Sequence, residues 1–160
     1  MPLKHHIIIE KIKKVDPSFD LATTDLRSCE DYKSLLSADE WILLAANISD
    51  RDILLAAKAM FEGETPWEDA RLGDLLNQHQ VNLREHKRIS TPKIDRMIEA
   101  ALGAGALGAK INGSGGGGCM FAYAPENPEA VVQAINEAGG KGYIIRVDVG
   151  TQEEKASLFY

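Results

Sequence analysis

The sequence predicts an α+β fold, and its C-terminal half carries most of the evidence. "TPKIDRMIEAALGAG" (91–105) and "NPEAVVQAINEAGG" (127–140) each open with a polar residue followed by proline and close at glycine, as helices do. Two short apolar segments, 108–112 and 119–124, flank a run of glycines, and 142–149 alternates as a strand does. The order helix, strand, glycine loop, strand, helix, strand is typical of a ferredoxin-like split βαβ sheet with helices on one face.

The residues before 91 predict further helices. "SDRDILLAAKAMF" (49–61) begins with a capping-box-like Ser-x-x-Asp ahead of a helix-forming run. "TPWEDARLGDLLNQHQVNLREHK" (65–87) begins with Thr65 as the expected N-cap and Pro66 at the first helical position. One helical stripe of this segment contains Leu72, Leu75, Leu76, His79, Leu83 and His86. The first forty residues are ambiguous, because "HHIIIEKI" fits either a strand or a short helix.

The bulk composition limits the possible functions. With 160 residues, of which 44% are hydrophobic and 26% charged, the chain has the size and composition of one soluble globular domain. Lys+Arg 18 against Asp+Glu 24 gives a net charge of −6, which argues against nucleic acid as the main partner. Cys29 and Cys119 do not have the spacing of a disulfide framework or a zinc site. No apolar run has the length of a signal peptide core or a membrane span, so we expect no membrane association and a reducing, cytoplasmic location.

The run "NGSGGGG" (112–118) requires an explanation, because successive glycines weaken any regular element. Gly113, Gly115 and Gly118 meet the pattern G-x-G-x-x-G, but dinucleotide binding needs a helix directly after the loop, and here an apolar strand follows. A Walker A loop needs lysine after its last glycine, and Cys119 stands there. A plain hairpin connection needs one or two glycines, not five. We therefore expect a loop whose backbone amides face an anionic ligand with no Cβ in the way.

Two stretches resemble the GHMP kinases, a family that includes galactokinase, homoserine kinase, mevalonate kinase and phosphomevalonate kinase. "GAKINGSGGGGC" (108–119) resembles the third signature motif of the family, a small-residue loop that closes over the active site beside the nucleotide triphosphate. "LGDLLNQHQVNLREHKRISTPKIDRMIEAALGAGALGAK" (72–110) is similar to the corresponding stretch of galactokinases. The matching positions in that stretch are Asn77, His79, Leu83, Arg84, Ser90, Pro92 and Asp95. The resemblance extends over roughly residues 50–149.

The resemblance implies an ATP- and Mg²⁺-dependent sugar kinase of galactokinase-like type, with the fold of a GHMP kinase C-terminal domain. It assigns nucleotide contacts to the loop residues Gly113, Ser114, Gly115, Gly116, Gly117 and Gly118. It assigns substrate contacts to Asn112 and Asp95, and it carries over no catalytic residue and no metal ligand. Galactokinases usually have arginine before the glycines and phenylalanine among them. This chain has Lys110 and an unbroken run, which look more like mevalonate-type or heptose-type members.

The main phosphate-holding loop of the family, a Gly-Leu-Ser-Ser type sequence of the N-terminal domain, does not occur in these 160 residues. The resemblance therefore implies that residues 41–160 form the C-terminal domain of a kinase, and that residues 1–40 are a segment without an assigned role. The partner is the ATP-binding N-terminal half, in cis or as a separate chain, and this chain alone is expected to be inactive. Two alternatives stay open: another GHMP member of mevalonate or heptose type, or a free-standing ferredoxin-like module that binds a small ligand.

A few polar residues have simpler interpretations beside the functional ones. His79 and His86 lie two helical turns apart, too far to share a metal as neighbours, so we expect both at the edge of the core. Asp95 fits a substrate contact or an ordinary acid in the first turn of a helix. Cys119 is expected to be a small core residue, and Lys110 fits either an approach to phosphate or an exposed strand lysine.

Overall fold

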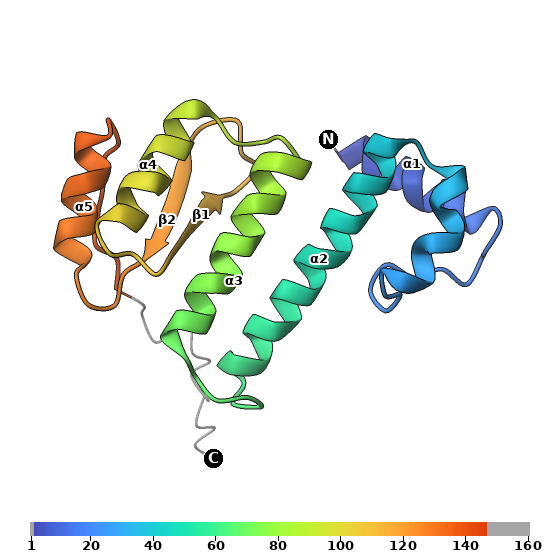
Figure 1. Ribbon diagram of the computed structural model, residues 1–160, viewed down its shortest axis with the longest axis horizontal. Coiled ribbons are helices and arrows are strands. Elements are labelled where there is room, and N and C mark those ends of the chain that lie inside the picture. Colours follow the sequence, from blue (N-terminus) through green and yellow to red (C-terminus); the bar gives the residue numbers. More distant parts are fainter. Residues whose placement is uncertain (1, 147–160) are drawn as a thin grey trace, which may run out of the picture.

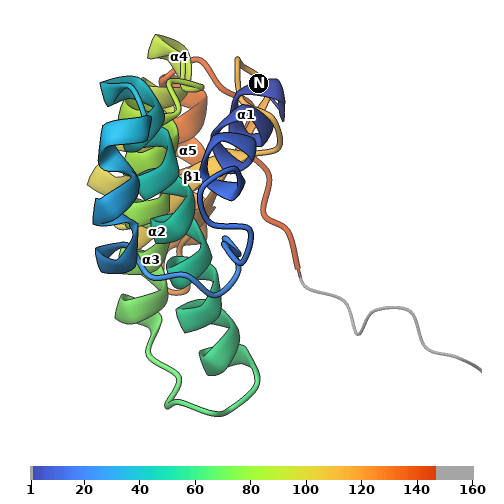
Figure 2. The same ribbon diagram turned by 90° about the vertical axis from the view of Figure 1, so that its right-hand side faces the viewer.

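The computed structural model describes residues 2–146 and places them in a mostly helical α+β arrangement (Figures 1 and 2). In chain order the elements are α1 (Pro2–Lys13), the 3₁₀ helix η1 (Arg27–Leu35), α2 (Ala38–Phe61), α3 (Asp69–Val81), the π-helical turn η2 (Asn82–His86), α4 (Pro92–Gly103), β1 (Gly108–Asn112), β2 (Cys119–Tyr123) and α5 (Pro128–Glu137). The predicted α+β class is confirmed. Among the described helices, none is both long and apolar enough to cross a membrane.

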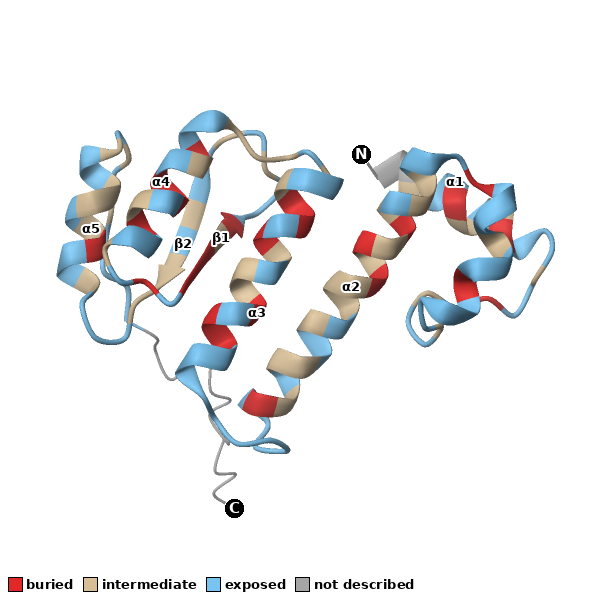
Figure 3. Cartoon of the chain, viewed as in Figure 1, coloured by how far each residue is buried: buried red, intermediate tan, exposed pale blue. Residues whose placement is uncertain are grey.

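The N-terminal residues form a helical layer against the first half of α2. The ambiguous segment "HHIIIEKI" belongs to α1, which carries buried residues on one side (Figure 3). Ile8 and Ile12 are among them. A spacing of four residues fits one face of a helix and one face of a strand, and packing against α2 decides the choice here. Ile8 and Ile12 share a hydrophobic cluster with Cys29 of η1 and with Leu44 and Ile48 of α2. A domain boundary at residue 41 would fall inside α2, and the division of the chain stays a prediction.

The start of α2 differs from the prediction. Ser49 lies inside a helix of 24 residues that begins at Ala38, because Ser37 and Glu40 form a complete capping box. Ser37 Oγ accepts a hydrogen bond from the Glu40 amide at 3.3 Å, and Glu40 Oε2 accepts one from the Ser37 amide at 2.9 Å. These two bonds satisfy amides at the helix start, so the helix needs no further N-cap downstream.

The start of α3 also differs from the prediction. Thr65 and Pro66 lie in an exposed connection, and the helix begins at Asp69. The Trp67 ring packs edge-on against Phe61 at 5.1 Å between centroids, and its Nε1 donates a hydrogen bond to Asp69 Oδ1 at 2.8 Å. These contacts hold the connection as a turn, so Pro66 does not occupy the first position of a helix.

The two proline-started helices of the C-terminal half are confirmed. Thr91 is the N-cap of α4, and its Oγ1 accepts a hydrogen bond from the Ile94 amide at 3.3 Å. α5 begins at Pro128 and is followed by Gly139 at a φ of 88°. Proline presets the helical φ and has no amide to leave unsatisfied, so its place in the sequence marks both helix starts.

β1 and β2 form a two-stranded antiparallel sheet, with Gly108 opposite Tyr123 and Asn112 opposite Cys119. One hydrophobic cluster joins α4 to this hairpin, and its buried members are Leu83, Ile94, Met97, Ile98, Ala109 and Ile111. α4 therefore fixes the hairpin from which the glycine loop projects (Figure 1).

The third predicted strand is not formed in the described residues. Residues 142–146 are in no strand, and 147–149 lie outside the described residues. Tyr143, Ile144 and Ile145 are 66%, 49% and 80% exposed. An alternating sequence becomes a strand only where it finds an edge to pair with, so the predicted ferredoxin-like sheet is reduced here to its central hairpin.

Two side-chain amides of α3 take the place of a neighbouring strand along β1. Asn77 Oδ1 accepts a hydrogen bond from the Ala109 amide at 3.1 Å, and Asn77 Nδ2 donates to the Leu107 carbonyl at 3.0 Å. Gln80 Oε1 accepts from the Ile111 amide at 2.9 Å. The edge of β1 that faces away from β2 is therefore satisfied by a helix.

This contact requires glycine on both elements. A Cβ on Gly108 would lie 2.4 Å from the carbonyl oxygen of Gly73, and a Cβ on Gly73 would lie 2.5 Å from the carbonyl oxygen of Leu107. Such distances are far below van der Waals contact, so any larger residue would separate α3 from β1. The close approach fixes the start of β1, the strand that leads into the glycine loop.

Candidate functional site

The glycine loop, residues 113–118, connects β1 to β2 at the end of the molecule where η2 leads into α4 (Figure 1). All five of its glycines have a positive φ, from 74° to 122°. Residues with a Cβ rarely adopt this region, so the backbone path itself requires glycine. A Cβ on Gly113, Gly116, Gly117 or Gly118 would meet nothing within 4 Å, so these four positions face open space.

The loop is fixed at its centre by the connection between η2 and α4. The Gly116 amide donates a hydrogen bond to the Ile89 carbonyl oxygen at 2.7 Å. A Cβ on Gly115 would lie 2.6 Å from the same oxygen, so this glycine permits the close approach. The Ile89 side chain packs against the hydrophobic cluster of α4 and the hairpin. The loop is thus bound at its middle and is not a free connection.

The hydrogen bond from Gly116 to Ile89, called the tether below, determines which loop amides remain available to a ligand. The Gly116 amide is used by Ile89, whereas the remaining loop amides have no acceptor within residues 2–146: those of Gly113, Ser114, Gly115, Gly117 and Gly118. These amides, the open space at Gly113, Gly117 and Gly118, and the exposed Ser114 hydroxyl suit the oxygens of a phosphate group. The residues present therefore fit the phosphates of a nucleotide.

Of the two predicted substrate residues, Asn112 directly precedes the loop and Asp95 lies in α4, after the connection that binds the loop. Asn112 is exposed at the end of β1, immediately before the loop. Asp95 is half-buried in the first turn of α4 and accepts a hydrogen bond from Ser90 Oγ at 2.6 Å. Ser90 directly follows Ile89, so Asp95 and the glycine loop are held by neighbouring residues of one connection.

The structure excludes one of the two interpretations of Lys110 and contradicts the expectation for Cys119. Lys110 is half-buried and not an exposed strand lysine: its Nζ donates to the Ile111 carbonyl at 2.7 Å and lies 5.2 Å above the centroid of the Phe121 ring. Burial lowers the pKa of Lys110, while the charge of Asp50 acts in the opposite direction. Cys119 is exposed and not a core residue, because it lies at the loop end of the hairpin, outside the cluster under α4.

A polar cluster that the sequence did not reveal anchors the connection after η2. Asp50 of α2 accepts hydrogen bonds from Lys87 Nζ and, at 2.7 Å, from Asn82 Nδ2, and His79 Nε2 lies 3.6 Å from Asp50 Oδ2. The side chains of Asp50 and Lys87 are only 13% and 18% exposed. Burial alone would raise the pKa of Asp50, but the hydrogen bonds from His79, Lys87 and Asn82 outweigh it and hold that pKa below its ordinary value.

The same residues shape η2. Asn82 Nδ2 also donates to Ser49 Oγ at 3.0 Å, and Asn82 Oδ1 lies 3.0 Å from His86 Nδ1. The Lys87 amide donates to the Asn82 carbonyl at 2.9 Å, which is the five-residue spacing of a π-helix. This wide turn leads to Ile89, whose carbonyl binds the loop. The Asp50 cluster, defined by Asp50, Lys87, Asn82 and His79, is therefore connected to the glycine loop through one short segment.

The histidines of α3 and η2 do not lie in equivalent places. His79 is half-buried at the edge of the core, as expected, and 29% of its side chain is exposed. His86 is exposed, so the expectation of a core-edge position is wrong for it. In the part of the chain that the structure describes, no three His, Cys, Asp or Glu side chains are grouped so that they could hold a metal ion.

Comparison with known proteins identifies the unit that carries the loop. The family model described as "GHMP kinases C terminal" matches residues 68–141, from the start of α3 to just beyond α5. Residues 68–141 are a GHMP kinase C-terminal domain. The match includes the hairpin, the glycine loop and the connection that binds it, so the resemblance drawn from these residues is confirmed.

The relatives of this GHMP domain are mostly mevalonate kinases. Those of Thermococcus gammatolerans and Thermococcus onnurineus are 48% and 45% identical over 77 and 86 residues, which are 48% and 53% of this chain. A galactokinase of Actinobacillus succinogenes is 40% identical over 72 residues, 42% of this chain. These matches cover 23%, 25% and 18% of the three proteins, so the chain spans a quarter of their length or less. The identities favour the mevalonate kinases over the expected galactokinase.

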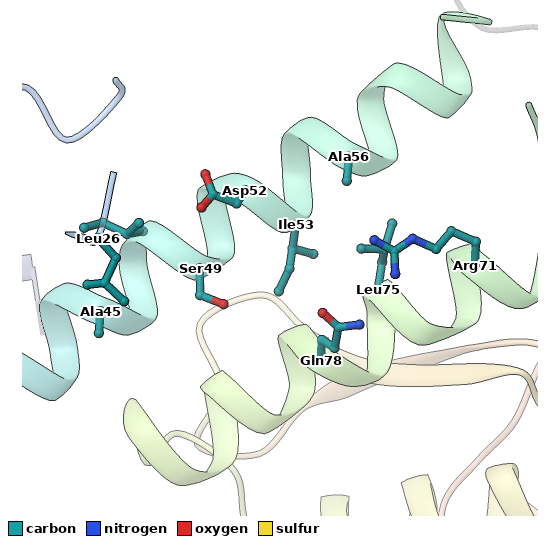
Figure 4. Close-up of a pocket in the computed structure, with 10 residues that line it drawn as sticks. Leu26, Ala45, Ser49, Asp52, Ile53, Ala56, Arg71, Leu75 and Gln78 are labelled. Carbon is teal, nitrogen blue, oxygen red and sulfur yellow. The ribbon is translucent and has the colours of Figure 1, made fainter. Parts of the chain in front are cut away.

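The GHMP domain also shares a small cavity with α2, on a different part of its surface. The cavity has a volume of about 280 Å³ and lies between α2 and α3 (Figure 4). Ile53 of α2 and Leu75 of α3 point into it, and Asp52 and Arg71 line it as well. None of the predicted site residues lines this cavity, so it is separate from the glycine loop.

Proposed function

We propose that this chain supplies the C-terminal part of an ATP-dependent small-molecule kinase of mevalonate-kinase type. The observation that carries the proposal is the tethered glycine loop, with five positive φ angles, inside a GHMP kinase C-terminal domain. The identities to mevalonate kinases support this type over a galactokinase-like enzyme, which was the first expectation.

The loop would act on the nucleotide phosphates. In phosphoryl transfer the protein mainly positions the reactants and stabilises the charge of the transferred group. The amides of Gly113, Ser114, Gly115, Gly117 and Gly118 would donate to phosphate oxygens, and Gly116 would fix the path of the loop through Ile89. Because the hydrogen bond from Gly116 to Ile89 fixes the path of the loop, little reorganisation would be needed when a nucleotide binds. Mg²⁺ would arrive with ATP and be held mainly by the N-terminal half of the kinase.

Asn112 and Asp95 would contact the acceptor substrate. Asn112 is exposed beside the loop, and its amide can donate or accept a hydrogen bond. The carboxylate of Asp95 is oriented by the hydrogen bond from Ser90. We assign both residues to binding, and we assign no catalytic residue to this chain.

The N-terminal half of the kinase would complete the active site and cover an apolar segment that is exposed in this chain. Tyr143, Ile144 and Ile145 form an exposed apolar segment of the kind that a stable protein usually covers. In the complete enzyme we expect this segment to form the third strand and extend the hairpin toward the ferredoxin-like sheet. We expect residues 41–160 to function as one unit with that half, in the cytoplasm.

The test is ADP release by the purified chain with MgATP, with mevalonate or galactose as acceptor, and with or without a separately expressed N-terminal half from the same locus. Activity only in the mixture, and with mevalonate, would support the proposal. Activity with galactose alone would favour the sugar kinase. Activity of the chain without any partner would refute our account of the missing half, and an inactive mixture whose chain still binds anions would favour a free-standing binding module.

A further inference from the structure

A second cavity, of about 560 Å³, lies between α1, the start of α2 and the connection that follows η2. Its volume is typical of sites for small ligands. Its lining includes three kinds of side chain: an apolar group, a basic group and two carboxylates. These are Ile7, Ile42 and Leu43, then Lys11, Lys87 and Arg88, then Asp39 and Glu40. No residue of the glycine loop lines it, so its occupant would be bound by a different set of groups.

Arg88, which lines this cavity, has a backbone conformation that is unusual for a residue with a side chain. Its φ is 54°, and within residues 2–146 it is the only residue other than glycine with a positive φ. Glycine would adopt this conformation without strain, whereas a residue with a Cβ loses stability there. Strain of this kind is concentrated at sites that clamp ligands. Folding alone would favour glycine at this position. We therefore expect the arginine side chain to have a role that offsets the backbone strain.

The guanidinium of Arg88 is also the least engaged cation of the cavity. Lys11 Nζ donates to both carboxylate oxygens of Glu40, at 2.7 and 2.8 Å, and Lys87 is held by the Asp50 cluster. The carboxylate paired with Arg88 is Asp39 at 3.9 Å, with the two side chains 74% and 84% exposed. Such a pair contributes little in water, so the guanidinium can exchange it for a better anion.

His5 offers a second donor to the same cavity. Its Nδ1 is hydrogen-bonded to Asn47 Nδ2, an amide donor, so Nδ1 accepts and the ring proton is on Nε2. Burial is the main cause that lowers the pKa of His5, which favours the neutral ring. The lining of the cavity thus combines the guanidinium of Arg88, the neutral imidazole of His5 and the apolar side chains described above.

We propose that this cavity binds a small organic anion, with a carboxylate or phosphate group on a short aliphatic body. The planar guanidinium of Arg88 would bind the anionic group through two parallel hydrogen bonds, and Ile7, Ile42 and Leu43 would contact the aliphatic body. The proposal does not depend on the kinase function, because it concerns residues outside the glycine loop.

The first experiment is an NMR titration of the 160-residue chain with hexanoate and hexyl phosphate, with 1-hexanol as the uncharged probe of the same length. We expect saturable shifts in the amides of residues 42–43 and 86–88 with the anions, and at least tenfold weaker binding of 1-hexanol. The stronger of the two anions identifies the preferred head group. Equal binding of 1-hexanol, or shifts confined to residues 113–118, would overturn the proposal.

The decisive variant is Arg88→Gly, because it removes the guanidinium and relieves the backbone at the same position. We expect a melting temperature equal to or above that of the parent chain and at least tenfold weaker hexanoate binding.

Arg88→Asn, which also tolerates the left-handed region, tests the same point if the glycine variant does not fold. Arg96→Asn, on an exposed face of α4, is the control and should bind hexanoate as the parent does. Parental affinity in a folded Arg88 variant would overturn the proposal, and so would a large loss of stability in both variants, since Arg88 would then serve folding.

Discussion

Replacing Asp50 with alanine should destabilise the chain strongly. The substitution removes the acceptor of Lys87 and Asn82 and leaves the charge of Lys87 without its partner, on a side chain that is only 18% exposed. Removing one partner of a buried ion pair costs about 3–5 kcal/mol. Partial exposure of Lys87 reduces this cost, and the lost hydrogen bond from Asn82 adds roughly 1 kcal/mol. We therefore expect a loss of about 2–4 kcal/mol in the free energy of unfolding.

Urea unfolding at pH 7, followed by circular dichroism, measures this loss. Asp52→Ala is the matched control on the same helix, because Asp52 is 59% exposed and, within residues 2–146, its ion-pair partner is the adjacent Arg51 at 2.7 Å. The Arg51 side chain is 17% exposed, but it also donates to the carbonyls of Leu21 and Thr24 and stays bonded without Asp52, so loss of this half-exposed pair should cost only about 0–1 kcal/mol. If Asp50→Ala were no more destabilising than Asp52→Ala, the Asp50 cluster would not anchor the connection that holds the loop.

The pH dependence of this effect has a definite sign. Folding lowers the pKa of Asp50 below its ordinary value of 3.8, so the ionised form contributes stability that is fully present above pH 3.8. That contribution is lost as the pH falls through the folded-state pKa. The stability difference between the parent chain and Asp50→Asn should be constant from about pH 7 to about pH 5 and should shrink below about pH 4. A difference that persists at low pH would refute the assignment to the charge of Asp50.

The other predictions concern packing, capping and the loop. Gly108→Ala should cost more than about 2 kcal/mol in thermal unfolding, because its Cβ would lie 2.4 Å from the backbone oxygen of Gly73; parental stability would mean that α3 and β1 are not in close contact. Ser37→Ala should cost about 1 kcal/mol through loss of the capping box, and an unchanged urea midpoint would argue against a helix start at residue 38. Gly116→Val would strain the loop backbone, because the φ of Gly116 is 74°, but its Cβ would meet open space, so the chain should stay folded while turnover in a complete kinase falls severely; full turnover would mean that the loop only connects β1 to β2.

Local signals in the sequence predicted the helices that start with proline and the hairpin around the glycines. Thr91 and Pro92 mark a helix start by their own chemistry, so no distant residue can displace it. The start of α2 was misplaced because Ser49 also fits an N-cap. The better match was Ser37 with Glu40, a Ser-x-x-Glu pair in a segment that offered no other pattern.

The remaining errors come from contacts between residues distant in sequence. Residues 142–146 alternate like a strand, but alternation does not supply a partner edge. The Asp50–Lys87 pair joins residues 37 apart, and the bond from Gly116 to Ile89 crosses between two elements. Neither contact leaves a periodic pattern in the sequence. The strained φ of Arg88 has no local signal either, because arginine does not favour that region.

The most direct test of the central claim is a graft of residues 68–141 into the mevalonate kinase of Thermococcus gammatolerans in place of the matching segment. The measurement is ADP release with MgATP and mevalonate by the folded chimera, with and without Gly116→Val. Our account predicts mevalonate-dependent turnover that the valine substitution removes while the chimera stays folded. A folded chimera that binds MgATP but transfers no phosphoryl group, or one that is unaffected by the substitution, would contradict it.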